Sequence, residues 1–180
     1  MLISFLQEGI LIRGAITRGE LFHYGDTIFG PALVEAYELE SKIAIYPRII
    51  FTRDVFWLEN FHSEIKEISQ ENIMNNVQID SDGWHYIDFI QVMTHFSSLS
   101  EYITFIDTVL NLISNFLKKN NINLKLKYGW LNRKINIILQ ELTHQNLEPQ
   151  DIKQLQSLQR KCENNARQLY SKIQLNEKVK

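Results

Sequence analysis

The sequence predicts an α+β protein in which a mostly antiparallel sheet with covering helices is followed by a C-terminal helical extension. Short segments rich in β-branched residues alternate with helical patterns up to residue 98, and long helical stripes of apolar residues follow from residue 99. With 180 residues, of which 44% are hydrophobic, the chain can bury a sizeable core. We expect an α+β domain over residues 1–98, a helical extension over 99–175 and a frayed tail over 176–180.

Composition limits the classes of function. The formal charge of -2 gives no bulk attraction to nucleic acid or to anionic lipid. The lone Cys162 excludes an intrachain disulfide and a CxxC zinc site, which fits a reducing cytosol. No apolar run approaches the roughly 20 residues that span a bilayer. We therefore expect a soluble, cytoplasmic protein with no nucleic-acid or membrane partner.

Residues 1–8 have the pattern of a helix, with Leu2, Phe5 and Leu6 on one face and Gly9 as its C-terminal stop. Two interpretations fit this spacing. The segment is either a short N-terminal helix or the last turns of a longer one, in which case the first structural element is missing and the domain is truncated at its N-terminus.

The next segment has the pattern of two strands. Ile10–Thr17 is apolar and β-branched enough for a buried strand. Arg18-Gly19 is expected to make the turn and Glu20–Tyr24 the short returning strand, which Gly25-Asp26 closes as a loop. The two strands are therefore predicted to pair with each other in antiparallel orientation.

A helix is predicted to begin at Pro31, because proline is tolerated in the first helical turn. Its apolar stripe comprises Leu33, Ala36, Tyr37 and Leu39 or Glu40. Glu38 and Lys42 have the i,i+4 spacing of an ion pair. Pro47 ends the helical pattern, and Arg48–Thr52 is predicted to be a central strand.

Asp54 is positioned to cap a second helix that extends to about Ile68. Val77–Ile79 and Trp84–Phe89 are predicted to form a hairpin around the Asp80–Gly83 turn. This turn lacks the glutamate that an EF-hand needs at its twelfth position, and the five histidines show no ligand spacing. We therefore predict no metal site.

Three helices are predicted in the extension. The stripe from Tyr102 to Phe116 indicates about five turns, and Leu124–His144 indicates a second helix, interrupted or started at Gly129. Pro149 starts the third. Its apolar positions are Leu155, Leu158, Cys162, Ala166, Leu169 and Ile173. Their spacing fits packing against the rest of the domain, and it also fits the seam of a coiled-coil dimer.

The stretch Leu11–Phe51 resembles the second half of the class III nucleotidyl cyclase catalytic domain. Its GAITRGE segment looks like the G-I-H-x-G strand motif of that family, and residues 30–41 look like the helical segment that follows, without a gap. It resembles more closely a divergent bacterial cyclase-like group that carries IFGPALxEAYELES, YPRI, DxDG and WL motifs. Residues 13–51, 80–89 and Trp130-Leu131 match them in order. This group includes the pyrimidine cyclases of bacterial anti-phage systems.

The resemblance implies a ferredoxin-like fold and, as the family activity, conversion of a nucleoside triphosphate into a cyclic nucleotide. Complete members bind two Mg2+ or Mn2+ ions through aspartates that lie upstream of this stretch, so we expect no metal cofactor in this chain. The family's transition-state asparagine and arginine fall at Val34 and Glu38. Valine cannot form a hydrogen bond, and a carboxylate repels phosphate. The catalytic residues are therefore unknown, and we expect the chain alone to be inactive.

Five residues are candidates for contact with substrate. Purine cyclases place a base-selecting residue three positions before the glycine that is Gly30 here. That position is Thr27, with Asp26 beside it; alternatively, the pair forms a turn that bonds its own backbone. Gly30, Val34 and Glu38 complete the set. Arg13, Arg18 and Arg48 could meet phosphates, or they could be solvated or ion-paired.

Two functions follow as hypotheses. The chain is a nucleotidyl cyclase-like protein that is incomplete for catalysis, or it is a non-catalytic binding or dimerisation module in bacterial signalling or defence. Since two subunits of the family build each active site, the resemblance implies a homodimer or a complete cyclase-like partner, with a nucleoside triphosphate as a further candidate ligand.

Overall fold

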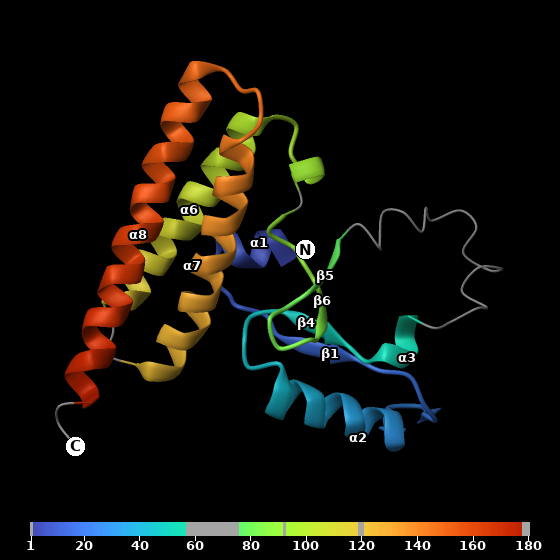
Figure 1. Ribbon diagram of the computed structural model, residues 1–180. Coiled ribbons are helices and arrows are strands. Elements are labelled where there is room, and N and C mark those ends of the chain that lie inside the picture. The colour runs from blue at the N-terminus through green and yellow to red at the C-terminus, as the bar shows by residue number, and fades with distance from the viewer. Residues whose placement is uncertain (1, 57–75, 92, 119–120, 178–180) are drawn as a thin grey trace. The chain divides into compact units, whose positions relative to one another are not determined.

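The computed structural model describes residues 2–56, 76–91, 93–118 and 121–177 (Figure 1). The chain divides into two compact units. Leu11–Phe89 forms the α+β unit, and Met1–Ile10 with Ile90–Lys180 forms the helical unit. In the described part of the chain, no helix combines the length and the apolarity needed to cross a membrane.

A four-stranded sheet is the centre of the α+β unit. Its order is β1 (Gly14–Ile16), β4 (Ile49–Phe51), β6 (His85–Ile87) and β5 (Val77–Ile79). β1 pairs with β4 in parallel, with Ala15 opposite Ile50, and the other two pairs are antiparallel. The predicted α+β class, the central strand near Arg48–Thr52 and the β5–β6 hairpin are confirmed, and the sheet is mixed.

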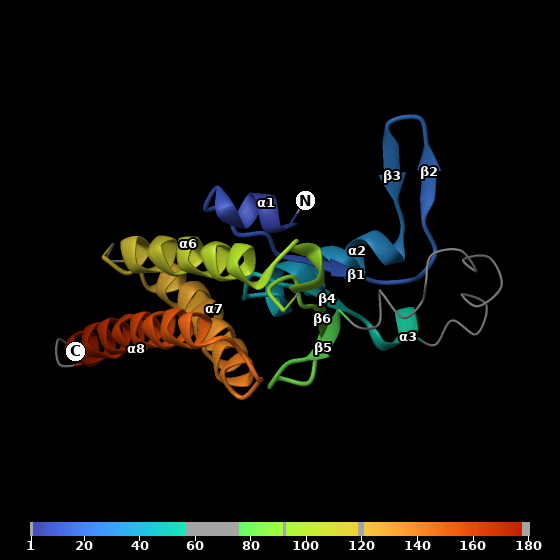
Figure 2. The same cartoon turned by 90° about the horizontal axis from the view of Figure 1, so that it is seen from above.

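The pairing predicted between residues 10–17 and 20–24 is wrong. β2 (Phe22–Tyr24) pairs instead with β3 (Thr27–Phe29), and these strands form a two-stranded hairpin outside the main sheet (Figure 2). The tight turn therefore lies at Gly25-Asp26 rather than at Arg18-Gly19. Gly25 adopts a φ of 56°, a conformation that glycine reaches without steric cost, so the chain reverses there.

Helix α2 (Pro31–Glu38) connects the parallel strands β1 and β4 and continues as the π-helical turn η1 (Leu39–Ile43). It lies along the sheet in Figure 1. The predicted start and the Glu38–Lys42 pair, at 2.8 Å, are confirmed. The predicted buried stripe is only partly right, because Leu33 and Tyr37 are 44% and 70% exposed. The small side chains of Ala32 and Ala36 are half-buried instead, which lets the helix approach β1 closely.

Helix α3 (Arg53–Phe56) follows β4 directly. Asp54 lies in its first turn, not at the cap position before it, because the helix begins at Arg53, two residues earlier than predicted. The remainder of the predicted helix, residues 57–68, lies outside the described residues.

Arg48 connects β4 to the turn between β5 and β6. Its guanidinium group is fully buried, forms ion pairs with Asp80 and Asp82, and donates a 3.1 Å hydrogen bond from Nη1 to Asp82 Oδ1. The rings of Tyr46 and Tyr86 lie 5.3 and 5.8 Å from its Cζ atom. A buried cation requires such compensation, so this cluster holds the turn against the central strand.

The helical unit contains α1 (Leu2–Gln7), the short 3-10 helix η2 (Met93–His95), and the long helices α6 (Leu99–Leu117), α7 (Ile122–Thr143) and α8 (Pro149–Glu177). The predicted N-terminal helix and the starts of α6 and α8 are confirmed. Glu101 N donates to Ser98 Oγ at 3.2 Å, and Ser97 N, one residue before this N-cap, donates to the Glu101 carboxylate at 2.8 Å, so side chains at both positions fix the start of α6.

Helices α6, α7 and α8 pack side by side as a three-helix bundle (Figure 1 and Figure 2). The first part of the apolar seam of α8 lies inside this bundle, with Leu155, Leu158 and Cys162 buried, so packing within the domain is confirmed for these residues over a coiled-coil dimer. The break predicted in α7 is wrong, because the helix runs through Gly129. A Cβ atom there would lie 2.6 Å from Leu169 Cδ2, so close approach to α8 explains this glycine.

We expect Arg48→Ala to lower the free energy of unfolding by about 3 kcal/mol, because it leaves two carboxylates without their buried cation. Arg13→Ala is the matched control. Arg13 forms a half-exposed pair with Glu40 at 2.5 Å, and its loss is expected to cost less than about 1 kcal/mol. Urea unfolding followed by circular dichroism measures both. Equal effects of the two substitutions would contradict the structural role of Arg48.

Candidate functional site

The five predicted substrate contacts all lie on the β2–β3 hairpin and α2. Asp26 is in the turn at the tip of the hairpin, and Thr27 is the first residue of β3; both are exposed. Gly30 joins β3 to α2, and Val34 and Glu38 are one turn apart on α2. In Figure 2 the tip points away from α2, so the structure does not bring Asp26 and Thr27 together with the helical pair.

Gly30 has a structural role in this arrangement. Its φ is 147°, and a Cβ atom at this position would lie 2.6 Å from the backbone oxygen of Glu20. The same oxygen accepts a 3.2 Å hydrogen bond from Ala32 N. The junction of β3 and α2 at Gly30 therefore lies so close to the backbone of Glu20, just before β2, that only glycine fits there.

The charged groups of α2 bind within the chain. The Glu35 carboxylate accepts a 2.6 Å hydrogen bond from the Thr17 hydroxyl, at the end of β1. Glu38 pairs with Lys42 and has a side chain that is 55% exposed. An anionic group thus lies at the position that the resemblance aligns with an arginine, and Val34, 60% exposed, offers no hydrogen bond at the position aligned with an asparagine.

The other residues proposed for phosphate contact have two different outcomes. Arg13 and Arg48 form ion pairs with carboxylates, as one of the two interpretations predicted, whereas Arg18 is exposed. Within the described residues, His, Cys, Asp and Glu side chains nowhere gather in a group of three or more that could hold a metal ion. Asp80 and Asp82, which the sequence placed in an ordinary turn, bind Arg48.

The most prominent feature of the hairpin and α2 is an exposed apolar surface. We define the hairpin–α2 surface as Leu21, Phe22, Tyr24, Ile28, Phe29, Leu33, Val34 and Tyr37. Tyr24 and Tyr37 are 80% and 70% exposed, and the other members are about half exposed. In the described part of the chain, seventeen large hydrophobic residues are exposed, and eight of them fall within this short stretch. Such clustering is typical of an interaction surface.

Apolar side chains stand on both faces of the hairpin. Phe22 lies opposite Phe29 with ring centroids 4.8 Å apart, and Ile28 points to the other face opposite His23. All six strand residues are exposed. A two-stranded hairpin by itself is marginally stable in water, so its aromatic residues are suited to be covered by another surface.

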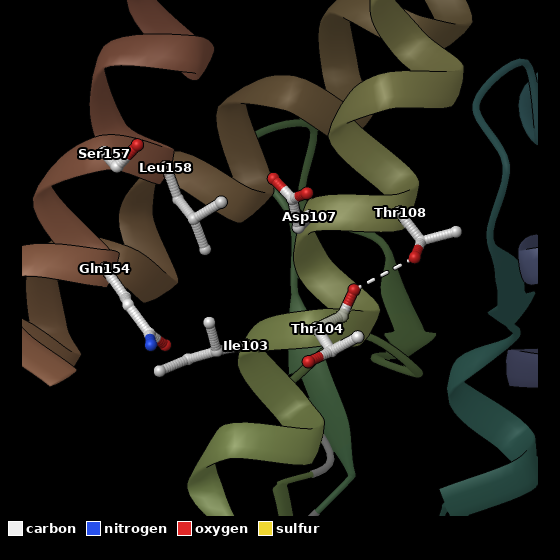
Figure 3. A pocket seen from close by; sticks show the side chains of 7 residues that line it. All are labelled: Ile103, Thr104, Asp107, Thr108, Gln154, Ser157 and Leu158. Atoms are coloured by element: carbon white, nitrogen blue, oxygen red, sulfur yellow. Dashed lines mark hydrogen bonds between the residues drawn. The ribbon is translucent and has the colours of Figure 1, made fainter.

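A hollow in the helical unit is a competing site. It encloses about 300 Å3 between α6 and α8, and its lining is Ile103, Thr104, Asp107, Thr108, Gln154, Ser157 and Leu158 (Figure 3). The hydroxyls of Thr104 and Thr108 donate to backbone oxygens one turn earlier, at 2.9 and 3.0 Å. Asp107 forms an ion pair with Lys161. Because these polar groups are engaged within the protein, the hollow offers fewer contacts to a ligand than the hairpin–α2 surface.

Comparison with protein-family models, with curated proteins and with solved structures found no match. The geometry of the chain itself therefore carries the functional argument.

The sequence missed the exposure of this surface. Helical spacing identified Leu33 and Tyr37 as apolar positions, and the sequence predicted a strand over residues 20–24 but not over 27–29. Neither pattern tells whether an apolar face is covered by the same chain or by another one. The density of aromatic residues around a Gly-Asp turn was the one available signal.

We expect Gly30→Ala to lower the free energy of unfolding by about 3 kcal/mol, because the new methyl group would collide with backbone that cannot rotate away. Gly25→Ala provides the control. Gly25 also has a positive φ, but a Cβ atom there meets nothing within 4 Å. Only about 1 kcal/mol is expected for it. Denaturant unfolding of both variants measures the two losses in the free energy of unfolding. Equal losses would contradict the close approach of the Glu20 backbone to Gly30.

Proposed function

We propose that the chain is a nucleotidyl cyclase-like module that acts by pairing with another subunit and does not catalyse cyclisation by itself. The observation that carries this proposal is the hairpin–α2 surface. The stretch that resembles the cyclases is the same stretch whose apolar residues are exposed. Its fold supports the proposal only at the level of an α+β architecture in which a helix connects two parallel strands.

The exposed apolar area of these residues, summed over both faces of the hairpin and over α2, is comparable to that of a protein interface. With about 200 Å2 of surface per large hydrophobic residue, the eight residues together expose about 900 Å2. A standard interface buries about 800 Å2 on each partner. Aromatic residues, which dominate interface energetics, make up half of the set.

A second copy of the chain is the proposed partner, in line with the two-subunit sites that the resemblance implies. A symmetric dimer uses the same residues on both subunits, so one set of exposed apolar residues in each chain is sufficient. A complete cyclase-like subunit is the alternative. It would supply the catalytic groups that Val34 and Glu38 do not provide, and any metal and nucleoside triphosphate would bind in that assembly.

The chemistry of α2 argues against turnover by this chain alone. Phosphoryl transfer requires donors and cations where negative charge develops. Glu38 adds negative charge, and Val34 adds no donor. A role in signalling or in defence against phage, as in the group that the sequence resembles, is then fulfilled through pairing.

Phe22→Ser with Phe29→Ser is expected to abolish self-association, because each aromatic ring at the centre of an interface contributes about 2 kcal/mol, or about thirtyfold in the dissociation constant. Sedimentation of the purified chain over a concentration series measures this. Leu126→Ser is the control, because Leu126 is also half exposed but lies on α7. A monomeric parent that binds a complete cyclase through Phe22 and Phe29 would support the alternative partner. Association unchanged by the double substitution would refute the interface.

The chain alone is expected not to cyclise nucleotides. Incubation of the purified chain with each common nucleoside triphosphate and Mg2+ or Mn2+ is expected to yield no cyclic nucleotide, because α2 carries neither of the groups that stabilise the transition state. Product formation is followed by chromatography and mass spectrometry, with a competent cyclase as the positive control. Turnover by the chain would disprove the non-catalytic part of the proposal without affecting the interface.

A further inference from the structure

A polar layer crosses the interior of the three-helix bundle. It consists of Ser114 from α6, Asn132 from α7 and Asn165 from α8. Asn132 and Asn165 are only 5% and 2% exposed, although asparagine is rare in protein interiors. The layer is separate from the hairpin–α2 surface and has no part in the function proposed above.

Hydrogen bonds connect all three helices through this layer. Asn165 Oδ1 accepts from the Ser114 hydroxyl at 2.7 Å, and Asn165 Nδ2 donates to Asn132 Oδ1 at 3.3 Å and to Leu110 O at 3.4 Å. Asn132 Nδ2 donates to Cys162 O at 2.9 Å. Both amides therefore donate and accept, which is the condition for burying them without a large penalty.

The apolar seam of α8 does not define a single register. Leu155, Cys162 and Leu169 repeat at intervals of seven residues, so a shift of α8 by seven residues replaces one apolar side chain by another. Leu158 and Asn165 also lie seven residues apart, but one is apolar and the other is polar. A shift of α8 by seven residues therefore exchanges a buried leucine for a buried asparagine. A shifted helix would place Leu158 against Ser114 and Asn132 and would leave buried amides without partners.

A contact at the bundle surface agrees with this register. Lys161, on α8, forms an ion pair with Asp107 and donates a 3.0 Å hydrogen bond to Asn111 Oδ1, both on α6. The side chains of Lys161 and Asp107 are 37% and 40% exposed, so water screens their attraction and the pair discriminates between registers less than a fully buried group does. Asn165 and its partners are the buried groups whose pairing a shift of α8 would break.

We propose that the Ser114–Asn132–Asn165 layer is a conformational device that selects the register of α8. The apolar residues supply the attraction between the helices, and the layer decides at which position along α6 and α7 helix α8 docks. Exchange of both amides for leucine is then expected to retain the bundle but to permit shifted docking of α8.

Disulfide trapping in the full chain tests this proposal, with Cys162→Ala in every sample to remove the natural thiol. Asp107→Cys with Lys161→Cys reports the observed register. Asn111→Cys with Gln154→Cys, and Asp107→Cys with Gln168→Cys, report shifts of seven residues in either direction, because Lys161 contacts both Asp107 and Asn111 in the observed register. Each pair is introduced into the parent, into N132L/N165L and into the control N164L, which makes the same exchange at the exposed neighbour of Asn165.

In N132L/N165L, the crosslinked fraction of a shifted pair is expected to be about tenfold higher than in N164L. In the parent, a shifted helix leaves a buried amide without a hydrogen-bond partner, and the double substitution removes this cost. Circular dichroism is expected to show an unchanged helix content, because both amides are replaced together and the Ser114 hydroxyl can turn from Asn165 Oδ1 to donate to Leu110 O, 2.9 Å away. Exclusive crosslinking of the 107–161 pair would overturn the proposal. Loss of the helices would overturn it too, since the layer would then provide stability and not register.

Discussion

A buried cation at the centre of the α+β unit is the constraint on which its sheet depends. Arg48 lies in the segment that leads into β4, and the carboxylates that neutralise it come from the turn between β5 and β6. Burial alone would raise the pKa of Asp82, but hydrogen bonds from Arg48 and from Trp84 N, with the charge of Arg48, outweigh it and lower this pKa. One side chain therefore connects the parallel part of the sheet to its antiparallel part.

The same sheet determines what α2 can present to other proteins. The helix packs through small residues such as Ala32 and Ala36, and its start is fixed where Gly30 meets the backbone of Glu20. This leaves Leu33 and Tyr37 exposed on the outer side of the helix. In the sequence they follow shortly after the aromatic residues of the hairpin. Because α2 packs against the sheet through its small residues, its large apolar residues remain exposed. The packing of the helix thus leaves these residues exposed for the proposed pairing.

Local signals in the sequence predicted the elements that local chemistry controls. The β5–β6 hairpin, the start of α8 at Pro149 and the Glu38–Lys42 pair depend on neighbours in the chain. The pairing of β1 with β4, the continuity of α7 at Gly129 and the burial of Arg48 depend on residues far away in sequence, and no local pattern encodes them. For the candidate site, the sequence pointed to the segment that carries the exposed apolar residues, but not to which of its side chains face solvent.

The single thiol of the chain lies beside the polar layer, with only 1% of Cys162 exposed. Burial, with the charge of Glu163 as a smaller cause, raises the pKa of Cys162 to about 12. Since the thiolate is the nucleophile, the docked thiol is inert to alkylating reagents and to oxidants at neutral pH. Its modification requires α8 to separate from the neighbouring helices. The rate at which a thiol reagent labels Cys162 therefore reports how often the bundle opens.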